Sequence, residues 1–277
     1  MSITKITDAA TLHNGVAMPW FGLGVWRTQE GEETVNAVRW ALARGYRHVD
    51  TASIYGNERG VGEGIRASGV PRAEVFVTTK VWNGDHGYDN TLRAFDESLK
   101  RLGMDYVDLY LVHWPVKGKF KETWRALEKI YADKRARAIG VSNFLEHHLE
   151  DLMGSAQVMP MVDQIEFHPR LQQPELIQFC RKHTIHVTAW APIMKGRVNE
   201  VPEIIALGKK YGKSPAQVTI RWELQREIVT IPKSVHKERI DANADVFDFE
   251  LSEQDVAAMN TLDQDERIGP HPDHIDF

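Results

Sequence analysis

Four residues whose side chains can carry proton chemistry stand at or just after the ends of short apolar segments. Asp50 and Tyr55 lie in "VDTASIYGNE", Lys80 follows "VFVTT", and His113 follows "DLYLV". Taken singly, each has an ordinary explanation as a turn former, a solvated cation, a hydrogen-bonded core histidine or a surface aromatic. For the four residues together that explanation is poor, because it must place an aspartate and a lysine at the ends of adjacent buried strands. Burying a lysine costs free energy unless an anion is paired with it. Asp50 is the natural partner of Lys80.

The chemistry that suits this set is general acid catalysis at a carbonyl oxygen. No serine or cysteine nucleophile stands beside a base here, so acyl transfer is unattractive. A free phenol has a pKa of roughly 10. At an effective dielectric constant near 20, a lysine charge about 4 Å away would favour the phenolate by up to ~4 kcal/mol, or ~3 pKa units, and screening and desolvation would reduce that value. We therefore expect Lys80 to lower the pKa of Tyr55, and His113 to orient a substrate oxygen while hydride arrives at carbon.

Eight short apolar segments, with helical patterns between them, would position these residues. They span residues 20–26, 47–52, 75–81, 107–114, 137–142, 161–167, 186–192 and 228–234. Strands that alternate with helices indicate parallel βαβ units, and eight can close a (β/α)8 TIM barrel. A doubly wound open sheet has similar local signals. In a barrel, the active site lies at the carboxyl ends of the strands, and here those ends carry Trp26, Asp50, Lys80, His113, Ser142-Asn143, Gln164-Glu166, Trp190 and Lys233-Ser234.

The helical signals are of two kinds. Apolar residues recur on one helix face in the ranges 35–42, 92–102 and 120–131, and Gly45 and Gly103 are placed as C-terminal stops. Ser214 followed by Pro215 marks the start of a helix over 214–225. Near the N-terminus, "NG" at residues 14–15 suits a type I′ turn. We expect an N-terminal β-hairpin there that caps the bottom of the barrel.

Composition narrows the class of protein. The chain has 277 residues, a formal net charge of -5 and one cysteine, Cys180. No linker marks a boundary, so we expect a single domain over residues 1–277. The charge gives no electrostatic case for binding nucleic acid or anionic membranes. The single cysteine, the lack of an apolar signal core and the lack of a transmembrane-length run favour a cytoplasmic protein.

Seven stretches, spread over nearly the whole chain, resemble motifs of the aldo-keto reductase superfamily. They are "GLGVW", "VDTASIYGNE", "TTKVW", "DLYLVHWP", "IGVSNF", "IPKS" and "NADVFDFELS", and their combination is highly specific. The resemblance implies a (β/α)8 barrel that reduces aldehydes or ketones with NADPH. It also implies a catalytic tetrad, with Tyr55 as proton donor, made of Asp50, Tyr55, Lys80 and His113.

The short loops and the short C-terminal tail look most like the bacterial branch that includes 2,5-diketo-D-gluconate reductases and methylglyoxal reductases. That implies a monomer with an open pocket for small carbonyl substrates, either α-dicarbonyls or keto sugar acids. By family position, the pocket is lined by Trp26, Ile54, Trp82, His113 and Trp114.

The resemblance also implies which residues hold the nicotinamide of NADPH/NADP+. Ser142, Asn143 and Gln164 match the positions that bind its carboxamide. Trp190 falls where the family stacks an aromatic side chain on the nicotinamide ring. Further cofactor positions that the resemblance implies are Gly24, Val25, Trp26, Asp50, Val235 and Asn243.

At the adenosine end, Lys233, Ser234 and Arg239 match the positions that grip the 2′-phosphate. Two cations and a hydroxyl after the last strand also suit an anion on physical grounds. Ala242 stands where the family commonly has an acidic residue, which implies that one contact to adenine is missing and that the cofactor is held less tightly. The short segment after residues 186–192 leads us to expect fast cofactor exchange.

Two other readings stay open. A metal-dependent barrel hydrolase would use His113, Glu166 and His168 and would contain a bound metal. A non-catalytic NADP(H)-sensing barrel would be favoured if one of the tetrad residues were replaced, but all four are present. We expect no metal site elsewhere: His147 and His148 are adjacent and should point to different faces of a helix, and "HPDH" near the end should be solvated.

Overall fold

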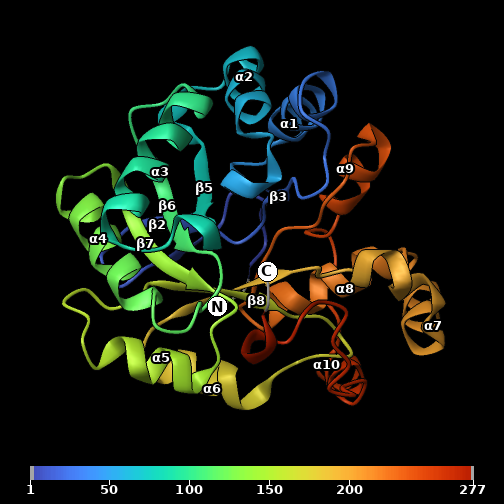
Figure 1. Cartoon of the computed structure of the whole chain (residues 1–277). Coiled ribbons are helices and arrows are strands. Elements are labelled where there is room, and N and C mark those ends of the chain that lie inside the picture. The colour runs from blue at the N-terminus through green and yellow to red at the C-terminus, as the bar shows by residue number, and fades with distance from the viewer. Residues whose placement is uncertain (1–2, 276–277) are drawn as a thin grey trace.

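The computed structural model describes residues 3–275, with the strands inside and the helices around them (Figure 1). Eight strands run parallel, and each pairs with its neighbours in sequence. They are β3 (Leu23–Gly24), β4 (His48–Asp50), β5 (Phe76–Val81), β6 (Val107–Val112), β7 (Ala136–Ser142), β8 (Val162–Glu166), β9 (His186–Trp190) and β10 (Val229–Thr230). All eight predicted strands are confirmed, most of them somewhat shorter than expected.

The first and last strands meet at a seam that closes the sheet. Parallel bridges join Phe21 to Thr230 and Gly24 to Lys233. A Cβ atom on Gly24 would lie 2.7 Å from the carbonyl oxygen of Ile231, so the two backbones approach closely only because this residue is glycine. The seam excludes the open-sheet alternative and agrees with the barrel that we expected.

Helices connect the strands and cover them with apolar faces. They are α1 (Glu32–Arg44), α2 (Glu58–Ser68), α3 (Tyr88–Leu102), α4 (Phe120–Ala132), α5 (Glu146–Met153), α6 (Pro174–Lys182), α7 (Pro202–Tyr211), α8 (Pro215–Gln225), α9 (Lys237–Asn243) and α10 (Glu253–Asn260). The predicted ends are confirmed: Gly45 and Gly103 end α1 and α3 in the left-handed conformation. The Ser214 hydroxyl accepts the N–H of Gln217 at 3.2 Å and caps α8.

The core explains why the strand ends are so well positioned. Every residue of β5 and of β6 is buried. Each large apolar side chain removed from water contributes roughly 1.5–3 kcal/mol, so these strands cannot slip without exposing apolar surface. Within residues 3–275, no helix combines the length and the apolar character needed to cross a membrane.

Before the barrel, β1 (Ala9–Thr11) and β2 (Ala17–Pro19) pair as an antiparallel hairpin. The predicted type I′ turn is wrong. Such a turn needs positive φ at both central residues, and of this pair only Gly15 has it, at 85°. The Asn14 amide instead donates to the carbonyl oxygen of Arg137 at 2.9 Å. The hairpin also contacts the first residue of β9, because His186 Nε2 lies 3.1 Å from the carbonyl oxygen of Thr11.

Candidate active site

A buried ion pair lies where β4 and β5 end. The Lys80 ammonium donates to Asp50 Oδ1 at 2.6 Å and to the carbonyl oxygen of Thr51 at 2.8 Å. Gln164, on β8, donates its amide N–H to the other Asp50 oxygen at 2.7 Å. Lys80 is 0% and Asp50 2% exposed. The predicted partnership of Lys80 with Asp50 is confirmed.

Tyr55 reaches this pair from a short 3-10 turn, Ser53–Tyr55, that follows β4. The Ser53 hydroxyl donates to the carbonyl oxygen of Lys80 at 3.0 Å and ties the turn to β5. The Lys80 Nζ atom lies 5.1 Å from the centroid of the Tyr55 ring. The ring also meets His113 edge-on, with centroids 5.7 Å apart. All four residues predicted from the strand ends therefore lie together.

Asn57 is a positioning residue that the sequence analysis missed. Its side chain is buried, and its amide donates to the carbonyl oxygens of Val25 and Thr28 at 2.8 and 3.1 Å. Its own oxygen accepts the Thr51 hydroxyl at 2.7 Å. These bonds tie the loop after β3 to the loop that carries Tyr55. The only sequence signal was its place two residues after Tyr55.

Burial sets the protonation states of the site. It raises the pKa of Tyr55 well above its usual range, and the negative charge of Asp50 adds to the rise. The pKa of Tyr55 is therefore not lowered as we expected, because desolvation by burial is the dominant effect. Burial also lowers the pKa of Lys80, an effect that Asp50 opposes. Burial and the charge of Lys80 lower the pKa of His113 well below its usual range. Tyr55 and His113 are therefore both neutral near pH 7.

The residues expected at the nicotinamide end form one hydrogen-bonded network. The Ser142 hydroxyl donates to the carbonyl oxygen of Gln164 at 2.7 Å. The Asn143 amide donates to the carbonyl oxygen of His113 at 3.0 Å, and its oxygen accepts the indole N–H of Trp190 at 2.8 Å. Asn143 has a φ of 64°, which asparagine tolerates better than most residues. The network links the ends of β7, β8 and β9 to the backbone of His113.

Of the residues expected at the adenosine end, Arg239 is exposed, Lys233 is half-buried and Ser234 is buried. Within residues 3–275, the side chains of Lys233 and Arg239 form no ion pair with a carboxylate. Lys237, in contrast, pairs with Asp241 at 2.6 Å. Lys233, Ser234 and Arg239 lie within seven residues of one another after β10, and the Ser234 hydroxyl bonds the backbone of His236 at 3.1 and 3.3 Å. Two cations and a hydroxyl are residue types that suit a phosphate.

The other expected cofactor positions have mixed environments. Gly24 lies in the seam, and Val25 is buried with its N–H donated to the carbonyl oxygen of Asp50 at 3.1 Å. Asn243 is 7% exposed at the end of α9, and Val235 is partly buried.

The expected substrate residues differ in exposure. Trp26 and Ile54 are 42% and 48% exposed. Trp82 packs edge-on against His113, with ring centroids 5.3 Å apart. Trp114 is 7% exposed. Two apolar side chains therefore remain accessible, while two aromatic residues are more enclosed.

The residues of the hydrolase alternative do not converge. His168 Nε2 lies 3.0 Å from Glu166 Oε1, and the Glu166 carboxylate also accepts the N–H groups of Ile268 and Gly269 at 2.6 and 3.1 Å. In the part of the chain that the structure describes, one group of three possible metal ligands occurs, and it does not contain His113. The metal-dependent hydrolase therefore has no support in the geometry.

Comparisons with known proteins agree with this geometry. A family model described as "Aldo/keto reductase family" matches residues 21–264. The glyoxal reductase of Bacillus subtilis (strain 168) is 54% identical over 274 residues, which are 99% of this chain and 99% of that protein. The methylglyoxal reductase DkgA of Escherichia coli (strain K12) is 43% identical, with 95% of this chain and 96% of that protein covered.

A solved structure leads to the same family. A variant of Gox0644 in complex with NADPH is 44% identical and matches with a TM-score of 0.93, covering 98% of this chain and 99% of that one. The fold, the strand-end cluster and these matches converge on one assignment. The chain belongs to the aldo/keto reductase family of NADP-dependent carbonyl oxidoreductases.

Proposed function

We propose that this protein reduces small aldehydes and ketones to alcohols with NADPH, and that its substrates are α-dicarbonyls such as methylglyoxal or keto sugar acids such as 2,5-diketo-D-gluconate. The observation that carries the proposal is the buried Asp50–Lys80 pair beside Tyr55 and His113. The names of the glyoxal and methylglyoxal reductases support the α-dicarbonyl class.

In this proposal each tetrad residue has one role. Bound NADPH supplies the hydride. Tyr55 donates its phenolic proton as negative charge develops on the carbonyl oxygen, and its raised pKa keeps that proton in place until then. His113 is neutral and donates an N–H to the same oxygen. Lys80, held by Asp50, stabilises the phenolate that remains after the transfer.

The cofactor would be held at both ends of the barrel mouth. We assign Ser142, Asn143 and Gln164 to the carboxamide, and Trp190 to stacking on the nicotinamide ring. At the other end we assign the 2′-phosphate to Lys233, Ser234 and Arg239. The remaining cofactor contacts are assigned to Gly24, Val25, Trp26, Asp50, Val235 and Asn243. The hydrogen bonds of the first group and the uncompensated charge of the second support this orientation.

We also propose how the chain is organised. It forms one domain over residues 1–277, works as a monomer in the cytoplasm, and uses its N-terminal hairpin to cap the bottom of the barrel. The contact between Thr11 and the first residue of β9 supports the cap.

The test is NADPH consumption against methylglyoxal, glyoxal, a nitrobenzaldehyde, 2,5-diketogluconate and a keto ester. We expect turnover with several of these, and the highest kcat/KM with an α-dicarbonyl or the keto sugar acid. A preference for the bulky aromatic aldehyde would contradict the substrate class. Tight NADPH binding without turnover of any compound would favour the non-catalytic sensing barrel.

A further inference from the structure

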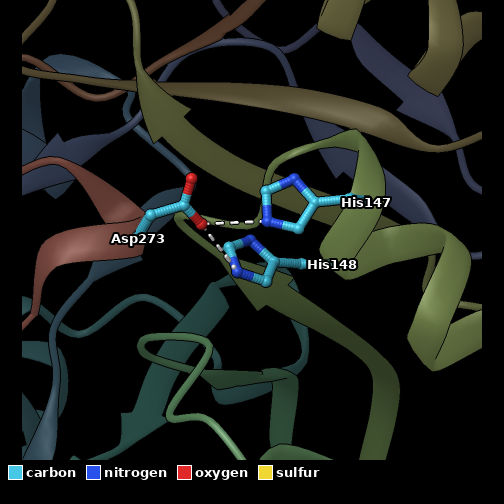
Figure 2. A group of neighbouring side chains, drawn as sticks. All are labelled: His147, His148 and Asp273. Atoms are coloured by element: carbon cyan, nitrogen blue, oxygen red, sulfur yellow. Dashed lines mark hydrogen bonds and ion pairs between the residues drawn. The ribbon is translucent and has the colours of Figure 1, made fainter.

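The C-terminal tail places a carboxylate between two neighbouring histidines on the first turn of α5 (Figure 2). Asp273 Oδ1 lies 2.9 Å from His147 Nε2 and 3.2 Å from His148 Nε2. The two imidazole rings have centroids only 4.0 Å apart. Our expectation that the histidines point to different faces is wrong, because both rings turn toward this one oxygen. Asp273, expected to be only solvated, is engaged as well.

We propose that His147, His148 and Asp273 form a binding site for a divalent transition-metal ion, and that Zn²⁺ is the ion that suits it. One candidate ligand atom from each residue lies within 4.8 Å of the other two. Zinc bonds of about 2.0–2.2 Å would bring such atoms to roughly 3.5 Å from one another, so the required shift is small. Two imidazoles and one carboxylate are donors that Zn²⁺ accepts, and they leave one position open for water.

The surroundings of the cluster favour a cation. A groove of about 300 Å³ opens beside His147, and the carboxylate residues Glu146, Glu175 and Asp265 contribute to its lining. The imidazole of His271 is also close, with Nδ1 4.0 Å from Asp273 Oδ2. His147 and Asp273 are 59% and 37% exposed, so an ion can reach them from solvent.

His148 must change its tautomer to take part. Its Nδ1 atom accepts the N–H of Leu145 at 3.2 Å, so in the metal-free protein Nε2 carries the proton and donates it to Asp273. Binding through Nε2 moves that proton to Nδ1 and breaks the Leu145 bond. His147 Nε2 also donates to Asp273 and must likewise shift its proton to Nδ1, but among the described residues His147 has no backbone hydrogen bond at Nδ1 to lose. We therefore expect His147 and Asp273 to supply most of the affinity, with His148 completing the site.

An ion here would connect two segments that lie beside Trp190. His147 follows Asn143, the partner of Trp190, by four residues. Asp273 follows Gly269 by four residues, and a Cβ atom on Gly269 would lie 2.4 Å from the Trp190 ring. A bound ion would therefore hold the tail against Trp190 and slow its opening. The metal site itself does not depend on the proposed function. Only an effect on cofactor release would.

The test uses the full chain without a histidine tag, stripped with EDTA and titrated with ZnCl2 by calorimetry. We expect one Zn²⁺ per chain, and affinity reduced more than about tenfold in both Asp273→Asn and His147→Gln. The matched control is His13→Gln, which removes another exposed histidine and should leave the affinity unchanged. MgCl2 should give no binding, since Mg²⁺ prefers oxygen ligands. Absence of one-to-one binding, or equal affinity in the two site variants and wild type, would overturn the proposal.

A second measurement tests the connection to the tail. Hydrogen exchange of residues 263–275 should slow when Zn²⁺ is added to the wild-type protein, and should not respond in Asp273→Asn. Unchanged melting of that variant without metal would show that it is folded. If Zn²⁺ binds to the wild-type protein but does not slow the hydrogen exchange of residues 263–275, the proposed restraint of the tail is wrong.

Discussion

Two clusters of this molecule bring carboxylate and nitrogen groups together, one of them buried and the other largely exposed. The strand-end cluster is Asp50, Tyr55, Lys80 and His113, and the α5–tail cluster is His147, His148 and Asp273. Asp50 and Lys80 are almost fully buried, whereas His147 is 59% exposed. In the buried cluster the protonation states are set by the fold, and every charge has its partner. In the other cluster His147 and Asp273 remain accessible to solvent and to ions, whereas His148 is 13% exposed. The comparison teaches that burial fixes the protonation states of a site at a cost in desolvation free energy, whereas exposure leaves the side chains able to bind protons or ions from solvent.

The largest expected effect is on chemistry in the buried cluster. Tyr55→Phe removes the hydroxyl and keeps the ring against His113. Loss of a general acid typically costs about 10²–10⁴-fold in rate, so kcat for methylglyoxal should fall by that much while NADPH affinity, measured by fluorescence titration, stays nearly unchanged. Normal turnover in this variant would remove Tyr55 as proton donor.

The second expected effect is on stability and compares two ion pairs of equal length. Lys80→Met leaves the buried Asp50 carboxylate without its cation, which should cost about 3–5 kcal/mol of unfolding free energy. The matched control is Lys121→Met. It breaks an exposed pair with Asp151, also at 2.6 Å, and should cost only about 0–1 kcal/mol. Urea unfolding measures both, and similar losses would contradict the role given to burial.

A smaller effect is expected at the adenosine end. Arg239→Ala should weaken NADPH binding by about 1.5–3 kcal/mol, the value of a hydrogen bond to a charged group. Binding of NADH, which lacks the 2′-phosphate, should change little. The control is Lys237→Ala, which removes a cation already paired with Asp241 and should therefore weaken NADPH binding less than Arg239→Ala does. Equal weakening of both cofactors by Arg239→Ala would contradict the phosphate assignment.

The smallest expected effect is the pH dependence of stability. Burial lowers the pKa of His48 and of His86 to about 4. Between pH 6.5, the ordinary pKa of histidine, and pH 4, the unfolded chain binds protons that the folded chain does not. The free energy of unfolding therefore falls as the pH falls. From pH 6.5 to 5.5 the loss should be about 1 kcal/mol for each histidine. Urea unfolding at the two pH values should show a smaller decrease in His86→Leu. An unchanged decrease would rule out His86 as a source.

Local pattern was enough to predict the strands, the main helices and the convergence of Asp50, Tyr55, Lys80 and His113. Asp50, Lys80 and His113 follow apolar segments, and parallel strands in a closed sheet bring their carboxyl ends to one face. Pattern did not reveal Asn57, because its partners Val25 and Thr28 lie in a different loop. It also gave the wrong turn for the hairpin, where the Asn14 side chain accepts the Val16 N–H and donates to the distant carbonyl oxygen of Arg137.

The amino-acid sequence by itself determined which residues stand at the strand ends and which motifs mark the family, because both depend on residue type and spacing alone. Only the tertiary structure decided the protonation of Tyr55 and His113, since desolvation and the Asp50–Lys80 pairing depend on packing between elements. It alone also brought His147 to Asp273, which is 126 residues away in the chain. Contacts at that separation follow from how the tail packs on the barrel, and no local pattern records them.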